Sequence, residues 1–518
     1  MTRGGLRRAV LSVAVVVFIS KALGFLREVV IAHRFGTSAE YDQYLIAVML
    51  PALAYGVLNF AAYYLFVPYF TRKLAAVDRS ENRATQDEIW PAVNLTIVIA
   101  AAVSIAIVIF SPMIMKIWAR DYAAAAYDEI VFYSRITAVI VLLGTTEAFL
   151  RAFLNASRVF TYPAAGIIVF NFVSISSIVL LAGSYSVGAI AFGLIAGLVL
   201  QNVFLLVQWW KYRQGTAITL SLINEDTRAV LVTGGILVII ELVNRSYFLI
   251  DRYFAIPFGE GIISALNYSQ VLVQLPDAIV GMAIGTVIFP LFSSPTDNQN
   301  PKAFGQSFRK ATLGALILAL PLAIIFLTNA RDIVYLVFRR GEFDDQSLTI
   351  TANVLRPYAL SIAALFIVST SIRACYSKGW GLTVLLFALV ALIVKFVATA
   401  LLSSWMAFPG ISAATTAANL LFGLLLLALV IRRTDWSSLP SFKQELAFMI
   451  VAAVVCWVVT LSADYTLFSH WKADTSLWAA FRIAGLGIVT VASFLGMVWI
   501  LGLRTALREC ILGTRLAS

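Results

Sequence analysis

The sequence predicts an all-α integral membrane protein. Hydrophobic residues make up 61% of the 518 residues, charged residues only 13%, and the mean hydropathy is +0.90. Fourteen apolar stretches run along the chain. Each is long enough to cross a bilayer core of about 30 Å as a helix of roughly 20 residues. Helices are the expected form because lipid offers no partner to an unpaired backbone group.

The first stretch follows a basic N-terminus with Arg3, Arg7 and Arg8. A signal peptide is excluded because the apolar run continues through Lys21 without a small-residue cleavage site. We therefore predict a retained first helix. The fourteen predicted spans are, in chain order, 9–34, 41–70, 89–111, 130–154, 161–182, 187–210, 229–256, 262–292, 308–328, 350–376, 381–404, 410–431, 444–462 and 477–503.

The net charge of +11 is accounted for by topology. With the N-terminus inside and the spans alternating, lysines and arginines concentrate in the connections on the N-terminal side. Positive residues mark the cytoplasmic side of a membrane protein, so both termini are predicted to be cytoplasmic. No basic cluster is dense or aromatic enough to indicate a nucleic-acid partner.

Residues that would carry metal or covalent chemistry are scattered. Cys375, Cys456 and Cys510 have no metal-ligand spacing, and His33 and His470 are isolated, so neither a metal site nor a disulfide framework is predicted. There is no Gly-rich phosphate loop or nucleophile elbow. We expect a protein without cofactors that is neither an enzyme nor an ATP-driven pump.

The first predicted span carries charges that lipid disfavours. At about 100° per residue, Ser20, Lys21, Gly24, Arg27 and Glu28 fall on one stripe of a helix. Ionisable residues inside a membrane generally face a water-filled space and mark a functional site. The stripe therefore predicts a substrate pathway beside this helix.

An internal repeat organises the chain, with matched positions 221 to 225 residues apart. Each copy has an acid, a Phe-Gly pair seven residues later and two prolines, followed further on by two arginines. The first copy consists of Glu28, Phe35-Gly36, Pro51, Pro68, Arg135 and Arg151-Ala152, and the second of Asp251, Phe258-Gly259, Pro276, Pro290, Arg356 and Arg373-Ala374. We expect Arg151, Arg356 and Arg373 to extend toward the membrane surface from helix ends.

Six spans separate each element from its counterpart, so the two copies are predicted to be parallel about an axis along the membrane normal. Residues 1–215 would form an N-lobe and residues 216–435 a C-lobe, with two additional helices and a tail in 436–518. Carriers built in this way bind substrate between the lobes near mid-membrane. The charged helices 9–34 and 229–256 are the expected lining.

Several motifs resemble the MurJ/MviN family of lipid II flippases in the multidrug/oligosaccharidyl-lipid/polysaccharide exporter superfamily. They cover most of residues 10–380 in order. The matching motifs are Ser20-Lys-Ala-Leu-Gly-Phe-Leu-Arg-Glu28, Phe35-Gly36, Asp42, Leu50-Pro51, Val67-Pro68, Ile263-Ser-Ala-Leu-Asn-Tyr268, Gln274-Leu-Pro276, Gly281-Met-Ala-Ile-Gly-Thr286, Phe289-Pro290, Val337-Phe-Arg-Arg-Gly-Glu-Phe343 and Arg373-Ala-Cys-Tyr376.

The resemblance implies a fourteen-helix transporter whose lobes enclose a cationic cavity, with a groove for a lipid tail. The implied substrate is undecaprenyl diphosphate carrying a peptidoglycan precursor. Lys21 and Arg27 match the two basic residues of the family's first helix, Glu28 the acid after them, and Asp42 the acid of the second helix. Guanidinium and ammonium groups stabilise a diphosphate, and acids release it by competing for the same cations.

Other family positions differ in this chain. Ala54-Tyr55-Gly56 and Asn59-Phe60 replace the family's basic and Glu-Gly residues, and Gln270-Val271 replaces its Asp-Arg. Arg245 is a candidate to restore one of the missing cations from another helix. The predicted substrate-binding residues are Lys21, Arg27, Asn59, Arg245 and Gln270; the predicted gating and coupling residues are Glu28, Asp42, Asp251, Lys395 and Thr399.

Some members of the family hold sodium near an acid that matches Asp251, and in this chain Lys395 and Thr399 occupy the facing positions on a later helix. An ammonium would stand where a cation would bind. We hypothesise that Lys395 is a built-in counter-ion for Asp251, which removes sodium dependence or replaces it with protonation. Extension of Lys395 to a membrane surface is the alternative.

The predicted function is to flip a polyprenyl-diphosphate-linked glycan to the outer leaflet by alternating access, in the bacterial inner membrane. We expect a monomer whose partners are this substrate, membrane lipid and a coupling proton or sodium ion, in peptidoglycan or related envelope synthesis. The alternatives are an exporter of another lipid-linked oligosaccharide, a small-solute or drug antiporter, a glycosyltransferase and a scaffold for wall-synthesis enzymes. An antiporter would need an acidic cavity, and a glycosyltransferase a large outer loop with paired acids.

Overall fold

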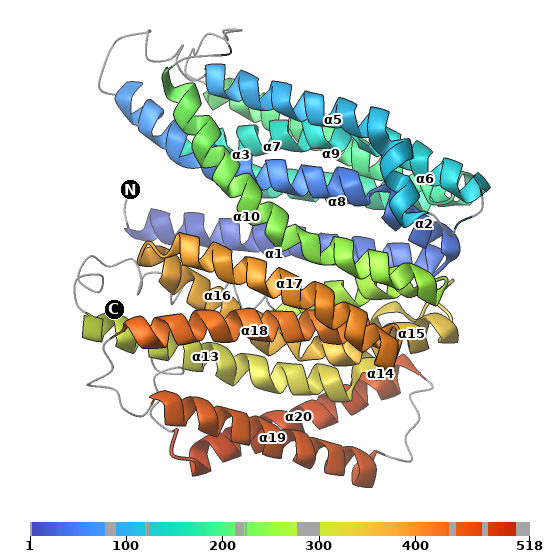
Figure 1. Ribbon diagram of the computed structural model, residues 1–518, viewed down its shortest axis with the longest axis vertical. Helices are drawn as coiled ribbons and strands as arrows, with labels where there is room; N and C mark the ends of the chain where they lie inside the picture. Colours follow the sequence, from blue (N-terminus) through green and yellow to red (C-terminus); the bar gives the residue numbers. More distant parts are fainter. Residues whose placement is uncertain are drawn as a thin grey trace. The chain divides into compact units, whose positions relative to one another are not determined.

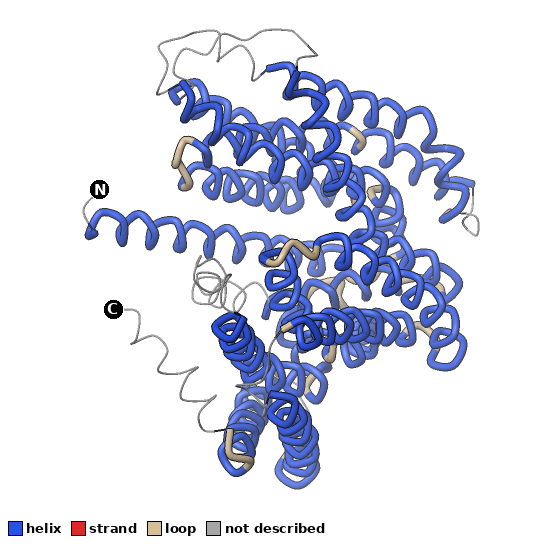
Figure 2. The backbone as a smooth tube through the Cα atoms, turned by 60° about the vertical axis from the view of Figure 1, so that its left-hand side comes forward, coloured by secondary structure: helices blue, strands red, loops and turns tan. Residues whose placement is uncertain are grey.

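A computed structural model of the chain describes residues 3–77, 90–119, 122, 124–212, 222, 225–276, 301–434, 442–468 and 475–503. Nearly all of these residues are helical (Figure 2). The predicted motif positions Gly281–Thr286, Phe289 and Pro290 and the predicted tail beyond residue 503 lie outside this part of the chain.

Figure 1 labels most of the described helices in chain order. They are α1 (Arg3–Phe35), α2 (Ala39–Ala47), α3 (Met49–Val77), α5 (Trp90–Trp118), α6 (Ala124–Thr137), α7 (Val139–Ala156), α8 (Thr161–Tyr185), α9 (Gly188–Tyr212), α10 (Glu225–Ala255), the 3-10 turn η1 (Ile256–Phe258), α13 (Pro301–Thr328), α14 (Ala330–Phe338), α15 (Asp345–Ala359), α16 (Ser361–Ser377), α17 (Gly381–Met406), α18 (Pro409–Arg433), α19 (Phe442–Leu467) and α20 (Ser476–Ile500).

The all-α membrane fold predicted from the sequence is confirmed. Within the described residues, 11 helices are long and apolar enough to span a membrane, or 12 when the bent pair α15 and α16 counts as one span. Two of the fourteen predicted spans, 9–34 and 262–292, are not among these helices. Residues 9–34 are helical as part of α1, and the charged residues of this helix lower its mean hydropathy. Of the predicted span 262–292, the structure describes residues 262–276, which form a helix.

The chain divides into two compact units, Met1–Glu260 and Gly261–Ser518. The division falls after α10 and not at the predicted lobe boundary near residue 215, because α10 packs against α3 and α5 of the first unit. The predicted lobes 1–215 and 216–435 therefore stay a prediction from the repeat.

The backbone of the two units repeats at the offset found in the sequence. Outside the glycines, three described residues have a positive φ: Arg158, Ser186 and Ala407. Ser186 (φ 44°) ends α8 and Ala407 (φ 56°) ends α17, 221 residues later. Arg158 (φ 61°) and Gly379 (φ 73°) have the same offset. Since few residues adopt this conformation, matched occurrences support a duplicated fold.

Helix breaks repeat as well. Ala138 separates α6 from α7 in the first unit, and Leu360 separates α15 from α16 in the second, where the bend is 42°. Gly36 (φ 51°) after α1 and Gly259 (φ 92°) after η1 form another matched pair. The hairpin of α8 and α9 in the first unit corresponds to that of α17 and α18 in the second.

An aromatic core fixes α3 against α7 in the first unit. Phe66 and Phe70 of α3 contact Phe149 of α7, with ring centroids 6.2 Å and 5.3 Å apart, and Trp90 of α5 packs on the same ring. All four side chains are buried. Large aromatic side chains bury much apolar area, so this core fixes the register in which the polar residues of α3 face α7.

Candidate polar site in the first unit

Three arginines from three helices of the first unit surround Tyr55 of α3. Arg27 of α1, Arg151 of α7 and Arg245 of α10 all lie within electrostatic range of this half-buried tyrosine, as does Glu147 of α7. Four helices therefore contribute to one polar cluster, which we call the arginine cluster. Guanidinium groups gathered in this way suit a phosphorylated ligand, because each presents a planar fork of donors.

The side chain of Arg27, a residue of α1, lies against α8. Its Nη2 is 2.8 Å from Glu28 Oε1, and its guanidinium lies over the ring of Phe170 at 5.5 Å from the centroid. The helices approach closely at this point, because Gly24 of α1 faces Asn171 of α8, whose amide donates to the Ser20 carbonyl at 3.4 Å. Ser20, Gly24 and Arg27 of the predicted stripe thus face α8.

Arg151 belongs to the most extensive network of the cluster. Its Nε is 3.1 Å from Glu147 Oε1, and its Nη2 donates to Asn59 Oδ1 at 2.9 Å. Its guanidinium lies 4.3 Å from the ring centroid of Tyr63. Arg151 is thus held by a buried carboxylate on its own helix and by an amide of α3.

Glu147 is only 4% exposed, and both of its oxygens are engaged. Asn59 Nδ2 donates to Glu147 Oε2 at 2.8 Å and also to the Gly144 carbonyl at 2.6 Å. Gln201 Nε2 of α9 donates to Glu147 Oε1 at 3.3 Å. The amide of Asn59, a predicted substrate-binding residue, therefore contacts Glu147 and Arg151 directly.

The side chain of Arg245 approaches α3 at Gly56, which has no side chain. Its Nε donates to Glu241 Oε1 at 2.6 Å, one turn earlier on α10. A Cβ atom built on Gly56 would lie 2.3 Å from Arg245 Cζ, so the guanidinium packs directly against the backbone of α3 at Gly56. Tyr55 makes a similar approach, because a Cβ on Gly144 would lie 2.1 Å from its ring.

The predicted acids Asp42 and Asp251 are buried at 1% and 7% exposure. Both lie within electrostatic range of Arg252, a cation of α10 that no sequence motif singled out. The guanidinium of Arg252 also lies 5.0 Å from the ring centroid of Phe248. A second group of opposite charges thus links α2 to the end of α10.

The other predicted site residues lie elsewhere. Lys21 of α1 is exposed. Gln270 is half-buried in the helix over 262–276 of the second unit. Lys395 is fully buried in α17, where its ammonium donates to the Ile411 carbonyl at 3.1 Å and to Thr415 Oγ1.

Thr399, one turn after Lys395, bonds back to the Lys395 carbonyl at 2.7 Å, as threonines in membrane helices commonly do. These hydrogen bonds of Lys395 and Thr399 lie within the hairpin of α17 and α18. Among the described residues, no three His, Cys, Asp or Glu side chains gather as a metal site.

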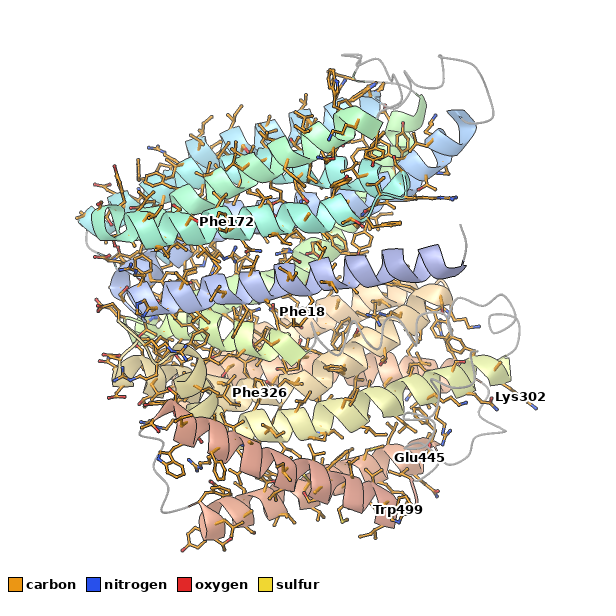
Figure 3. All side chains as sticks on the ribbon, turned by 180° about the vertical axis from the view of Figure 1, so that it is seen from behind. Phe18, Phe172, Lys302, Phe326, Glu445 and Trp499 are labelled. Carbon is orange, nitrogen blue, oxygen red and sulfur yellow. The ribbon has the colours of Figure 1, made fainter. Side chains whose placement is uncertain are left out.

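Ion pairs in the second unit connect α19 and α20 to the rest of it. Arg309 Nε of α13 donates to Glu445 Oε2 of α19 at 2.7 Å, and both side chains are buried. Figure 3 places Glu445 at the same end of the unit as Lys302 and Trp499.

A second connection joins α14, α19 and α20. Arg482 of α20 lies 3.1 Å from Asp332 of α14 and 2.6 Å from Asp464 of α19. Burial raises the pKa of Asp332, although the nearby Arg482 opposes this shift.

Neither Glu147 nor Glu241 was predicted from the sequence as a site residue, and Arg151 was expected only to extend toward the membrane surface. A signal was available, because each acid lies four residues before an arginine in an apolar helix. That spacing places both side chains on one helical face. What the spacing could not show is that the two pairs belong to the same cluster.

Comparisons with known proteins agree with this architecture. The family model "Lipid II flippase MurJ" matches residues 31–503. A probable lipid II flippase MurJ of Rhizobium meliloti is 24% identical over 507 residues, covering 93% of this chain and 91% of the relative. The lipid II flippase MurJ of Burkholderia cenocepacia is 23% identical over 520 residues, covering 96% and 98%.

Solved structures share the fold. A lipid II flippase MurJ in an inward closed conformation superimposes with a TM-score of 0.76 at 18% identity, covering 94% of this chain and 98% of that one. An inward-facing multidrug resistance transporter of the MATE family gives 0.66 at 13% identity, covering 80% and 94%. Since the family model spans most of the sequence, the chain belongs to the MurJ lipid II flippase family.

Proposed function

We propose that this protein flips a polyprenyl-diphosphate-linked glycan, lipid II or a similar envelope precursor, from the cytoplasmic to the outer leaflet of the bacterial inner membrane. Membership of the MurJ family and the multi-pass helical fold support this activity. The observation that carries it in this chain is the convergence of Arg27, Arg151 and Arg245 around Tyr55. A diphosphate in a membrane needs such donors.

A cation from another helix lies beside the segment of α3 where the resemblance implies basic residues. The family's basic residues on the second span are replaced by Ala54 and Tyr55, and the guanidinium of Arg245 rests on Gly56, the next residue. We propose that Arg245 supplies from α10 the charge that α3 lacks. Head-group binding is then assigned to Lys21, Arg27, Asn59, Arg245 and Gln270, and gating to Glu28, Asp42 and Asp251.

The proposed transport cycle requires no covalent step. Arg27 and Arg245 bind the diphosphate while the protein is open to the cytoplasm, and the polyprenyl tail stays in lipid. A change of access then exposes the head group to the outer side. Acids beside the arginines regain their partners as the substrate leaves, because carboxylate and phosphate compete for the same guanidinium groups.

Complementation tests the substrate. The host's own lipid II flippase is depleted, this chain is expressed, and survival is scored. We expect rescue by the wild type and loss of rescue by the Lys21→Ala, Arg27→Ala double variant at equal expression. Failure of a well-expressed wild type would contradict lipid II as substrate and favour another lipid-linked glycan. Rescue by the double variant would separate the activity from these cations.

We further propose that the buried ammonium of Lys395 makes transport independent of sodium. The full burial of Lys395 supports this proposal, since a buried ammonium occupies space and charge that a sodium ion would need. Transport in proteoliposomes should proceed equally in sodium and in choline buffers. Transport that requires sodium and survives Lys395→Met would contradict it.

A further inference from the structure

Each arginine of the arginine cluster is paired with an acid of its own helix. The pairs are Arg27 with Glu28, Arg151 with Glu147 and Arg245 with Glu241. In every pair the acid is the more buried partner: the side chains are 27% and 12%, 24% and 5%, and 41% and 10% exposed, respectively. The acids thus lie behind the guanidinium groups, which remain more accessible.

This pairing has an electrostatic consequence. Three unopposed guanidinium groups in a water-poor site would bind a diphosphate very tightly, since charge-assisted hydrogen bonds are strong where the dielectric constant is low. A transporter must also release its substrate. Acids that neutralise the arginines in the empty site lower the affinity, because the substrate must replace them.

The pair of Arg151 and Glu147 is the clearest case. Asn59 and Gln201 hold both oxygens of Glu147, so the carboxylate stays in place when Arg151 changes partner. Asn59 Oδ1 and the ring of Tyr63 orient the guanidinium. The pair also lies close to Tyr55, because Asn59, which bonds to Glu147 and Arg151, donates to the carbonyl of Gly144, and the ring of Tyr55 lies against Gly144.

We propose that Arg151 is a further binding residue for the diphosphate and that Glu147 is its competing counter-ion, which sets the affinity and permits release. This inference rests on the proposed function and deepens it. Arg151 then adds a third guanidinium to Arg27 and Arg245. Glu147 does not touch the substrate and acts through Arg151, so it is a positioning residue.

Binding of farnesyl diphosphate, a short polyprenyl diphosphate, to the purified full chain in detergent tests the inference. Glu147→Gln keeps the shape of the side chain, removes its charge and replaces one of its two acceptor oxygens by an amide donor. We expect this variant to bind the probe about threefold to tenfold more tightly, whereas Arg151→Gln should bind about tenfold more weakly. Arg151→Lys should fall between, because it keeps the charge and loses the planar fork.

The transport assay supplies a second readout. In proteoliposomes, Glu147→Gln should lower both KM and the maximal rate, because tighter binding slows release. A purely structural role predicts no gain in affinity. Glu445→Gln is the matched control, since it removes the charge of an equally buried, arginine-paired acid far along the sequence; it should leave affinity for the probe unchanged.

The results of these experiments distinguish the role of Arg151 and Glu147 from the proposed flippase function. If the wild type binds farnesyl diphosphate and the Arg151 variants bind it equally well, or Glu147→Gln binds it no more tightly, the inference is overturned while the proposed function stands. If the wild type neither binds the probe nor rescues a flippase-depleted host, the proposed function itself fails. Melting temperatures of all variants identify any that do not fold, and Arg151→Lys replaces Arg151→Gln in that case.

Discussion

At the scale of single residues, two glycines decide where polar side chains can lie. Gly56 gives room to the guanidinium of Arg245, and Gly144 gives room to the ring of Tyr55. Both contacts are too close for any side chain larger than hydrogen. The family resemblance alone suggested a loss of cations on α3, whereas the glycine explains how a cation from α10 reaches the same place.

Gly56→Ala tests this arrangement. The new methyl group would meet the far end of a flexible side chain, so Arg245 should move and the fold should persist. We expect the affinity for farnesyl diphosphate to fall by about tenfold, which corresponds to about 1.4 kcal/mol, with little change in melting temperature. Gly183→Ala is the control, because its Cβ meets nothing within 4 Å. Equal affinity of the two variants would contradict the role of Gly56.

Asp344 stabilises the N-terminus of α15. It caps α15 by accepting a hydrogen bond from the Ser347 amide at 2.7 Å, and this bond lowers the pKa of Asp344. Asp344→Ala should lower the free energy of unfolding by about 1 kcal/mol at neutral pH, measured by denaturant unfolding.

The sign of the pH dependence follows from the lowered pKa of Asp344. The charge-dependent part of its stabilisation is present above the unfolded-state pKa of about 3.9 and is lost as the pH falls through the lower folded-state pKa. Asp344→Asn keeps a capping oxygen without a charge, so its difference from wild type should vanish in acid. A difference between the two that does not change with pH would contradict this account.

At the scale of helices, the hairpins that close the two repeats share an unusual backbone. Ser186 and Ala407 both have positive φ, with ψ of −131° and −144°, in a region that favours glycine. The turn must place two long helices side by side within a few residues, which explains why the conformation persists in both copies.

Ala407→Gly should therefore stabilise the protein by about 1 kcal/mol, because glycine adopts this conformation without a clash of Cβ. Ala400→Gly, in the exposed interior of α17, should destabilise it by about 1 kcal/mol. Thermal unfolding in detergent measures both. A loss of stability in Ala407→Gly would show that the turn does not strain the alanine.

The buried pair of Arg309 and Glu445 connects α13 to α19. Arg309→Met should destabilise the second unit by roughly 3–5 kcal/mol, because Glu445 would be left buried without its partner. The double variant Arg309→Met, Glu445→Met should recover most of this loss. Denaturant unfolding measures the free energy of unfolding of each variant. If the double variant is no more stable than Arg309→Met, a buried unpaired charge is not the cause of the loss.

At the scale of the whole molecule, the distribution of lysines and arginines predicts which connections are cytoplasmic. Single cysteines placed in a cysteine-free background should report the sidedness to a membrane-impermeant maleimide. We expect Glu342→Cys, in the connection between α14 and α15, to react in intact cells. Arg432→Cys, at the end of α18, should react only after permeabilisation, because the positive residue lies inside. The opposite pattern would invert the proposed topology.

The fold class, the approximate helices and the duplication could all be predicted from the amino-acid sequence. Hydropathy and length suffice for these because every backbone group in lipid must be paired within a helix. Motifs at fixed spacing also determined the family, and the breaks at Ala138 and Leu360 show that the repeat extends to the backbone.

Which charged side chains contact one another depends on how the helices pack. Arg151 and Glu147 were one turn apart in any helix, but their bonds to Asn59 and Gln201 depend on how α3 and α9 pack against α7. Likewise, nothing in the spacing of Arg245 indicated that it would rest on Gly56. Contacts between helices depend on packing angles and on small residues that permit close approach, and these are set by the whole unit and not by local periodicity.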